Sequence, residues 1–135
     1  MKPRSFVLSL GTNSGGEPLI VQARQLIEAQ LGAIRMSRVM QTEPIGISSP
    51  PFLNAMAVGC TTLTAAELRA VLKKTERMCG DTRELRRQNV IMLDIDLLQL
   101  GSRSYKPEDW QRDYIQELSE ELGIEIVNLK SGNSK

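Results

Sequence analysis

Phe52-Leu-Asn-Ala-Met-Ala-Val-Gly-Cys-Thr-Thr62 is the stretch that decides the fold. Its side chains alternate with a period of two, which predicts a β-strand with two different faces. One face carries Phe52, Asn54, Met56, Val58 and Cys60, and the other carries Leu53, Ala55, Ala57 and Gly59. Thr64-Ala-Ala-Glu67 follows as a capping box, so the strand leads directly into a helix that Gly80 ends.

The chain before this segment predicts a strand, a helix and a second strand. The first strand spans Ser5–Leu10 and is followed by a glycine-rich loop over residues 11–16. An apolar stripe then predicts a helix over Glu17–Leu31, and Ile34–Met40 has a strand pattern. Residues 42–51 contain three prolines and are predicted to form a loop.

The chain after this segment predicts one long strand and further C-terminal elements. Residues 81–89 form a polar loop, and Val90–Leu100 has the composition of a strand. A third helix begins at Pro107, since proline suits the first helical turn. Its apolar face holds Trp110, Tyr114, Ile115, Leu118 and Leu122. Ile124–Leu129 is a candidate short strand.

The resulting order is β-α-β-β-α-β-α, which predicts an α+β fold of the ferredoxin-like βαββαβ type. Its antiparallel sheet would carry helices on one face, plus a C-terminal helix. We predict a single domain over residues 1–129 and a frayed tail over residues 130–135.

Charge and composition exclude several classes of function. The 135 residues include 17 Lys and Arg, 16 Asp and Glu, and no histidine. A net charge near zero argues against a nucleic-acid partner, and the lack of histidine excludes Ser-His-Asp chemistry and imidazole–zinc sites. No apolar run suggests a membrane span or a leader. We therefore expect a cytoplasmic protein, a monomer or weak dimer, with Cys60 and Cys79 as free thiols.

Leu93-Asp-Ile-Asp-Leu-Leu98 is the most informative stretch for chemistry. Asp94 and Asp96 share one face of the predicted strand, with Cα atoms about 6.5–7 Å apart. That face would also carry Met92, Leu98 and Leu100, and the opposite face Ile91, Leu93, Ile95 and Leu97. Two like charges on an apolar strand suggest a hard cation such as Mg²⁺. The alternative is a solvated face of an edge strand.

Three arginines precede this strand, at positions 83, 86 and 87. Arg83, Arg86 and Arg87 are candidates for binding phosphate oxygens, although a solvated charged loop has the same composition. Metal-binding carboxylates with nearby cations are the recurring parts of phosphoryl-transfer sites.

Two other segments are candidates for the rest of a site. Gly11-Thr12-Asn13 allows a close approach of the backbone to a ligand, but it lacks the lysine of a Walker A loop. Asn54 lies on the same face as Phe52, and an amide beside a ring suits a flat heterocycle that forms hydrogen bonds. The alternative is an Asn54 whose hydrogen bonds go to neighbouring backbone.

These motifs together resemble one family. Leu10-Gly-Thr-Asn13, Thr42-Glu-Pro44, Phe52-Leu-Asn-Ala55, Glu76, Gly80 and Leu93-Asp-Ile-Asp-Leu97 are similar, in order and spacing, to 6-hydroxymethyl-7,8-dihydropterin pyrophosphokinase of the folate pathway. The resemblance covers about Ser5 to Leu100.

The resemblance implies transfer of pyrophosphate from ATP to the hydroxymethyl group of a dihydropterin. It implies that Asp94 and Asp96 hold two Mg²⁺ ions, with Asp94 also near the reacting hydroxyl. It places the pterin against five residues, namely Thr42, Pro44, Ile45, Phe52 and Asn54. Glu76 would lie near ATP, and the loops over residues 42–51 and 81–90 would act as lids. The residues themselves, rather than the resemblance, make Arg83, Arg86 and Arg87 the further candidates for ATP binding.

The sequence also departs from the family. The usual Trp-Gly-Pro-Arg-Thr before the aspartates is replaced by Gln88-Asn-Val-Ile-Met92, and the histidine segment is missing. The candidate replacements are the cations of Arg83, Arg86, Arg87, Arg103 and Lys106 and the ring of Trp110. Two alternatives follow. One is a catalytically impaired relative that binds pterin or nucleotide, and the other is a ferredoxin-like interaction domain.

Overall fold

The computed structural model describes residues 2–124. Its centre is an antiparallel sheet with the strand order β2-β4-β1-β5-β6, in which β3 also pairs with β4. The strands are β1 Arg4–Thr12, β2 Arg35–Met36, β3 Met40–Thr42, β4 Phe52–Thr61, β5 Asp94–Leu100 and β6 Arg103–Ser104. The helices are α1 Gly16–Leu31, α2 Ala65–Met78, α3 Arg83–Arg87, α4 Pro107–Trp110 and α5 Asp113–Leu122. This architecture confirms the predicted α+β ferredoxin-like class.

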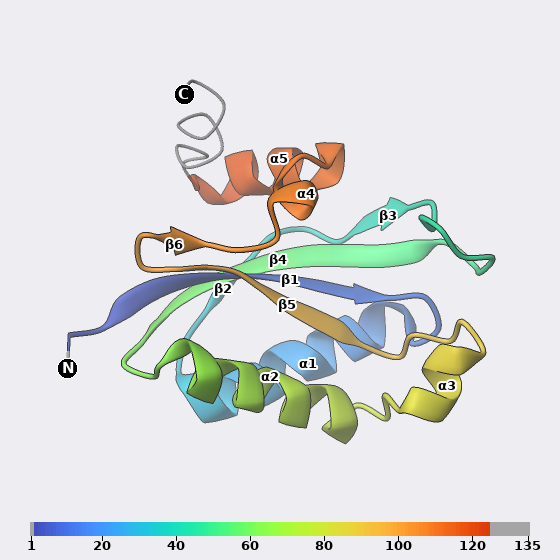
Figure 1. Cartoon of the computed structure of the whole chain (residues 1–135), viewed down its shortest axis with the longest axis horizontal. Helices are drawn as coiled ribbons and strands as arrows, with labels where there is room; N and C mark the ends of the chain where they lie inside the picture. The colour runs from blue at the N-terminus through green and yellow to red at the C-terminus, as the bar shows by residue number, and fades with distance from the viewer. Residues whose placement is uncertain (1, 125–135) are drawn as a thin grey trace.

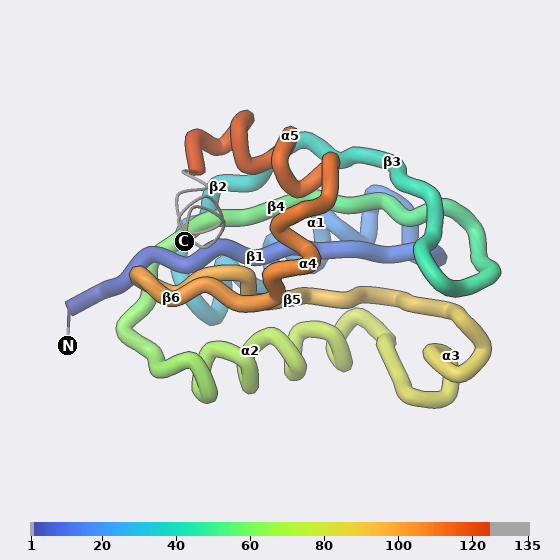
Figure 2. Tube along the Cα trace, turned by 45° about the horizontal axis from the view of Figure 1, so that its top comes forward, coloured from blue at the N-terminus to red at the C-terminus, as the bar shows by residue number. Residues whose placement is uncertain are grey.

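The sheet lies between two helical layers (Figures 1 and 2). Helices α1 and α2 cover one face, where they pack on a core that includes Phe6, Leu8, Leu10, Ala57 and Leu97. Helices α4 and α5 cover part of the other face, over a second core of Val7, Met56, Leu98, Trp110, Ile115, Leu118 and Leu122. The predicted C-terminal apolar face is therefore confirmed, although it belongs to two helices rather than one.

The segment that decided the fold behaves as its pattern predicts. Ala55 and Ala57 face α1 and α2, whereas Met56 faces α5. The capping box is present, because the Thr64 hydroxyl accepts a hydrogen bond from the Glu67 amide at 3.1 Å. In return the Thr64 amide donates to the Glu67 carboxylate at 2.9 Å.

The predicted strand over residues 34–40 is wrong in detail, because it is divided into β2 and β3. Ser37 lies between them and forms two hydrogen bonds with Met56. Its amide donates to the Met56 carbonyl at 2.9 Å, and its hydroxyl accepts from the Met56 amide at 2.8 Å. A side chain thus replaces part of the strand pairing and holds the chain against β4.

The expected boundaries around β5 also need correction. The strand begins at Asp94 rather than Val90, because side chains bind the preceding backbone. Asn13 accepts from the Ile91 amide at 2.8 Å, and Asp81 accepts from the Met92 amide at 3.1 Å. The predicted polar loop contains the short helix α3, which begins with Thr82 as N-cap.

A bulge in β5 reverses part of the predicted facing. Val7 pairs with Gln99 but Leu8 pairs with Leu97, so Leu98 has no partner on β1. Leu100 consequently belongs to the core beneath α1 and α2, not to the aspartate face. Met92 precedes the strand and packs against the same core, so its predicted facing is also wrong.

Three further expectations concern the cysteines, a membrane span and the C-terminal segment. Both cysteines are free, with Cys60 exposed and Cys79 buried. Within residues 2–124, no helix has the length and apolar character needed to cross a membrane. The candidate strand over Ile124–Leu129 and the tail over residues 130–135 lie outside the described residues, except for Ile124 itself.

Candidate functional site

One row of residues crosses the sheet on the face opposite α1 and α2. In this row Gly11 of β1 pairs with Asn54 of β4 on one side and with Asp94 of β5 on the other. Paired residues in an antiparallel sheet point to the same face. Because Gly11 has no side chain, the space between Asn54 and Asp94 stays open, with their Cα atoms about 10 Å apart. Two residues further along the strands, on the same face, Ser9 pairs with Asp96.

A cavity of about 240 Å³ lies over this row. It is lined by Ser9, Leu10, Gly11, Thr42, Glu43, Ile45, Phe52, Asn54, Asp94, Asp96, Asp109, Arg112 and Tyr114. The fold therefore brings together both predicted metal-binding aspartates and four of the five predicted pterin-binding residues. Pro44 is the fifth, and the lining does not include it.

Asn54 is fixed at the wall between β4 and β3. Its side-chain amide donates to the Thr42 hydroxyl at 2.6 Å and lies 3.4 Å from the Met40 carbonyl oxygen. Only 6% of Asn54 is exposed. A Cβ atom at position 11 would lie 3.2 Å from Asn54 Oδ1, so a side chain there would crowd this amide. Backbone contact thus accounts for only part of the Asn54 hydrogen bonding.

Each aspartate of β5 has one cationic neighbour from a different element. Asp94 Oδ1 lies 3.2 Å from Arg86 Nη2, and Asp96 Oδ1 lies 3.4 Å from Lys106 Nζ. Burial and the nearby Asp94 raise the pKa of Asp96 to about 6, although Lys106 opposes this shift. The two carboxylates are partly enclosed, with side-chain exposures of 40% for Asp94 and 26% for Asp96. They are therefore less exposed than a freely solvated strand face implies.

Arg86 is a fixed part of the protein framework. Its guanidinium pairs with the buried Asp81, donates to the Leu93 carbonyl at 3.0 Å and lies 3.8 Å from Glu76. Together with Asp94, these contacts tie α3 to the start of β5. The other two predicted phosphate ligands, Arg83 and Arg87, do not line the cavity.

Glu76 lies beneath the sheet rather than in the cavity. It projects from α2 and accepts a hydrogen bond from the Ile95 amide at 2.7 Å. Burial raises its pKa, opposed by that hydrogen bond, and the charge of Asp94 adds to the rise. Its position supports β5 directly under the two aspartates.

The two predicted lid loops touch each other. The Asn89 amide lies 3.4 Å from the Ser48 carbonyl oxygen. Asn13 holds the second loop from below, because its side-chain amide donates to the Asn89 carbonyl at 2.8 Å. The Gly-Thr-Asn motif thus contributes Gly11 to the cavity and Asn13 to the support of residues 89–91.

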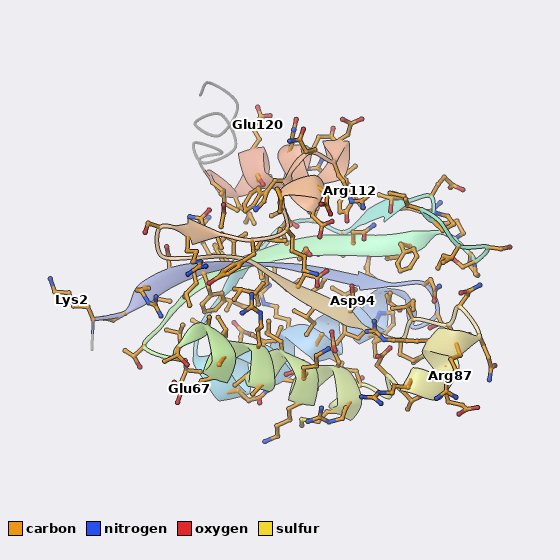
Figure 3. All side chains as sticks on the ribbon, in the orientation of Figure 1. Lys2, Glu67, Arg87, Asp94, Arg112 and Glu120 are labelled. Atoms are coloured by element: carbon orange, nitrogen blue, oxygen red, sulfur yellow. The ribbon has the colours of Figure 1, made fainter. Side chains whose placement is uncertain are left out.

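The C-terminal helices supply residues that the sequence patterns did not assign to the site. Asp109, Arg112 and Tyr114 line the cavity from α4, its junction with α5, and α5 itself. Figure 3 shows Arg112 above the sheet and Arg87 out on α3. Tyr114 was expected only in the helix core, and no periodicity separates a core ring from a cavity ring. Trp110 is not a replacement ring, because it is buried and its indole N–H donates to the Leu98 carbonyl at 3.1 Å.

The carboxylate oxygens at this site are ligands that suit a hard cation. Among the described residues, no group of three or more Asp, Glu, Cys or His side chains is arranged to hold a metal. Asp94 and Asp96 nevertheless face one cavity with carboxylate oxygens, and Mg²⁺ is usually held by one or two carboxylates plus phosphates and water. The oxygen donors of Asp94 and Asp96 are therefore of the kind that Mg²⁺ prefers.

Comparison with known proteins finds relatives of this chain. A folate synthesis bifunctional protein of Chlamydia caviae is 30% identical over 110 residues, covering 76% of this chain and 25% of that protein. A folate synthesis bifunctional protein of Arabidopsis thaliana is 29% identical over 134 residues, covering 90% of this chain and 28% of that protein. The chain thus spans about a quarter of the length of these relatives.

The family model for 7,8-dihydro-6-hydroxymethylpterin-pyrophosphokinase (HPPK) matches residues 7–124. The match extends past Leu100, where the resemblance of the motifs ends, and it includes α4 and α5. The C-terminal helices that close the cavity are thus part of the matched region. The chain belongs to the HPPK family.

Proposed function

We propose that this protein transfers pyrophosphate from ATP to 6-hydroxymethyl-7,8-dihydropterin, with Mg²⁺, in folate biosynthesis. The observation that carries the proposal is the row Asn54–Gly11–Asp94. This row has the amide of Asn54 at one end and the carboxylate of Asp94 at the other, and both line one cavity, which supports a heterocycle site on one side and a metal–phosphate site on the other. Family membership supports the reaction class.

The pterin would occupy the β3–β4 side of the cavity. Asn54 and Thr42 form its polar wall, whereas Phe52 and Tyr114 supply rings and Ile45 an aliphatic surface. Aromatic rings favour stacking on a planar ligand, and hydrogen-bonding groups at its edge fix its orientation. Pro44 stays a prediction for the same binding site, next to the lining residues Glu43 and Ile45.

The phosphates would occupy the β5 side. Asp94 and Asp96 would hold two Mg²⁺ ions, which when bound neutralise the triphosphate and polarise its oxygens. Arg112 lines the same cavity, where it pairs with Asp109 at 3.4 Å, and would add one positive charge for the phosphates. Arg83 and Arg87 of α3, with Arg86 and Glu76, stay predictions for ATP contacts.

The reaction needs positioning and charge more than a strong base. The pterin hydroxymethyl oxygen forms a bond to the β-phosphorus, and the bond from that phosphorus to the α–β bridging oxygen breaks. AMP leaves with the bridging oxygen, and the hydroxyl proton is released. Closure of the loops over residues 42–51 and 81–90 would exclude water, which otherwise competes with the pterin.

The decisive assay measures AMP released from Mg-ATP, with and without 6-hydroxymethyl-7,8-dihydropterin. We expect pterin-dependent AMP, and we expect Asp96→Ala to reduce it by at least about 100-fold. Glu120→Ala removes an exposed carboxylate from α5 as a matched control and should leave the rate unchanged. Equal rates for the wild type and Asp96→Ala would contradict the proposal.

A second candidate is a relative that binds pterin or nucleotide without catalysis. The observation that favours it is that the cavity lining contains none of the three predicted phosphate-binding arginines. Calorimetric binding of the dihydropterin without any AMP release would support this candidate over the enzyme.

The remaining expectations concern the surroundings of the protein. We propose small molecules as its only partners, without nucleic acid or membrane, and a cytoplasmic location. A monomer or weak dimer stays a prediction, which sedimentation of the purified protein would test.

A further inference from the structure

Lys106 occupies an unusual position between β6 and α4. Its backbone lies in the left-handed region, with φ 54° and ψ 62°, immediately before Pro107. Residues before proline normally prefer extended conformations, and a non-glycine residue in this region is uncommon. From this position the ammonium group reaches Asp96 Oδ1 at 3.4 Å.

The two cations beside the aspartates differ in how firmly they are held. Arg86 has hydrogen bonds to Asp81, to the Leu93 carbonyl and to Asp94, so leaving Asp94 would not free it from the framework. Asp96 is the ion-pair partner found for Lys106, whose side chain is 50% exposed. A half-exposed lysine on a flexible stem exchanges partners at little cost.

We propose that Lys106 is the exchangeable counter-cation of this site, which neutralises Asp96 in the empty cavity and binds a substrate phosphate once a divalent cation takes Asp96. This inference rests on the proposed function for the identity of the phosphate ligand. The motif that this chain resembles has an arginine where this chain has Ile91. We infer that Lys106, which lies outside the motif, supplies a positive charge in its place.

The charges around the cavity support both halves of this role. The cavity lining holds four carboxylates, of Glu43, Asp94, Asp96 and Asp109, against the one guanidinium of Arg112, which pairs with Asp109 at 3.4 Å, so the lining carries a negative excess. An ammonium at 3.4 Å from Asp96 reduces that repulsion. Lysine side chains are ordinarily charged at neutral pH. Lys106 is not among the lining residues, but its ammonium contacts Asp96, which is, so a phosphate that shares a metal ion with Asp96 would lie close to this ammonium.

The test uses Lys106→Met in the full chain and compares two titrations by calorimetry. In the first, Mn²⁺ alone is added as the probe of the carboxylates. The variant should bind it about two- to fivefold more tightly, because the competing ammonium is gone. In the second, α,β-methylene-ATP is added with Mg²⁺, and the variant should bind it about tenfold more weakly, because a charge-assisted contact is lost.

Two further variants keep this test specific. Lys106→Arg retains the charge and should stay close to wild type in both titrations. Lys74→Met removes an exposed lysine of α2 and should change neither. Circular dichroism of each variant verifies that it folds.

A merely structural role of Lys106 would not make the variant bind Mn²⁺ more tightly and the nucleotide more weakly. Unchanged or weaker Mn²⁺ binding by Lys106→Met overturns the counter-cation role, and unchanged nucleotide binding overturns the phosphate role. Wild-type protein that binds no nucleotide would instead contradict the proposed function. In that case the Mn²⁺ titration still tests the pairing of Lys106 with Asp96.

Discussion

The side-chain amide of Asn54 donates a 2.6 Å hydrogen bond to the hydroxyl of Thr42, and this bond ties β4 to β3 at the cavity wall. Asn54 Oδ1 is oriented toward Gly11, on the cavity side of the amide. One residue thus connects the sheet framework to the predicted heterocycle site. Changes to either partner should alter substrate binding more than they alter the fold.

Asn54→Ala should raise the KM for the dihydropterin by about 10- to 100-fold, because a buried hydrogen-bonding group is lost from the wall. The KM for ATP should change much less, since Asn54 and Asp94 lie at opposite ends of the row. Steady-state kinetics with each substrate varied in turn measures both effects. Thr42→Ser keeps the hydroxyl that Asn54 needs and should stay near wild type; equal losses in the two variants would contradict this account.

The stabilising effect of Mg²⁺ should depend on pH through Asp96. Burial and Asp94 raise the pKa of Asp96 from 3.8 to about 6. Without metal, this group's contribution to the free energy of unfolding is therefore complete below 3.8 and is lost as the pH rises through about 6. A divalent cation needs the carboxylate form, so its binding must displace the proton at low pH.

We accordingly expect Mg²⁺ to raise the Tm more at about pH 7.5 than at about pH 5. Thermal unfolding with and without Mg²⁺ at both values measures the difference. In the Asp96→Asn variant the amide at this position does not titrate, so the effect of Mg²⁺ on the Tm should lose most of its pH dependence. A metal effect that is the same at both pH values in the wild type would argue against Asp96 as a ligand.

Arg86→Met should destabilise the protein by about 1–3 kcal/mol, because it leaves the buried Asp81 without its cation and frees the Leu93 carbonyl. Urea denaturation measures this change. Arg87→Met is the matched control: Arg87 is 71% exposed and pairs with the equally exposed Glu84, so its loss should cost little. Similar stability of the two variants would show that the Arg86 network does not hold α3.

Trp110→Phe should lower the free energy of unfolding by about 1–2 kcal/mol, because the Leu98 carbonyl loses its indole donor. Trp110→Ala should cost about 3–5 kcal/mol through the cavity left in the second core. Chemical denaturation followed by circular dichroism measures both. Val21→Ala, at a side chain that is 53% exposed, should stay within about 0.5 kcal/mol of wild type.

Local pattern predicts the parts of this fold whose cause is local. The period of two in β4 and the Thr64–Glu67 capping box need no distant partner, and both are present. The division of β2 from β3 depends on Ser37 bonding to Met56, a residue far away in the sequence. The bulge at Leu98 depends on register with β1, so alternation alone misplaces Leu100.

The candidate site divides in the same way. The Asp-x-Asp spacing and the Asn54 facing follow from strand geometry, so the sequence by itself determined which side chains share a face. Tertiary structure decided that Gly11 separates them, that Arg86 is a framework residue, and that Arg112 and Tyr114 close the cavity. The physical reason is that the direction in which side chains point repeats with the backbone period of a single strand or helix. Contacts across the sheet and from α4 and α5 instead depend on how separate elements pack, and no local pattern encodes that packing.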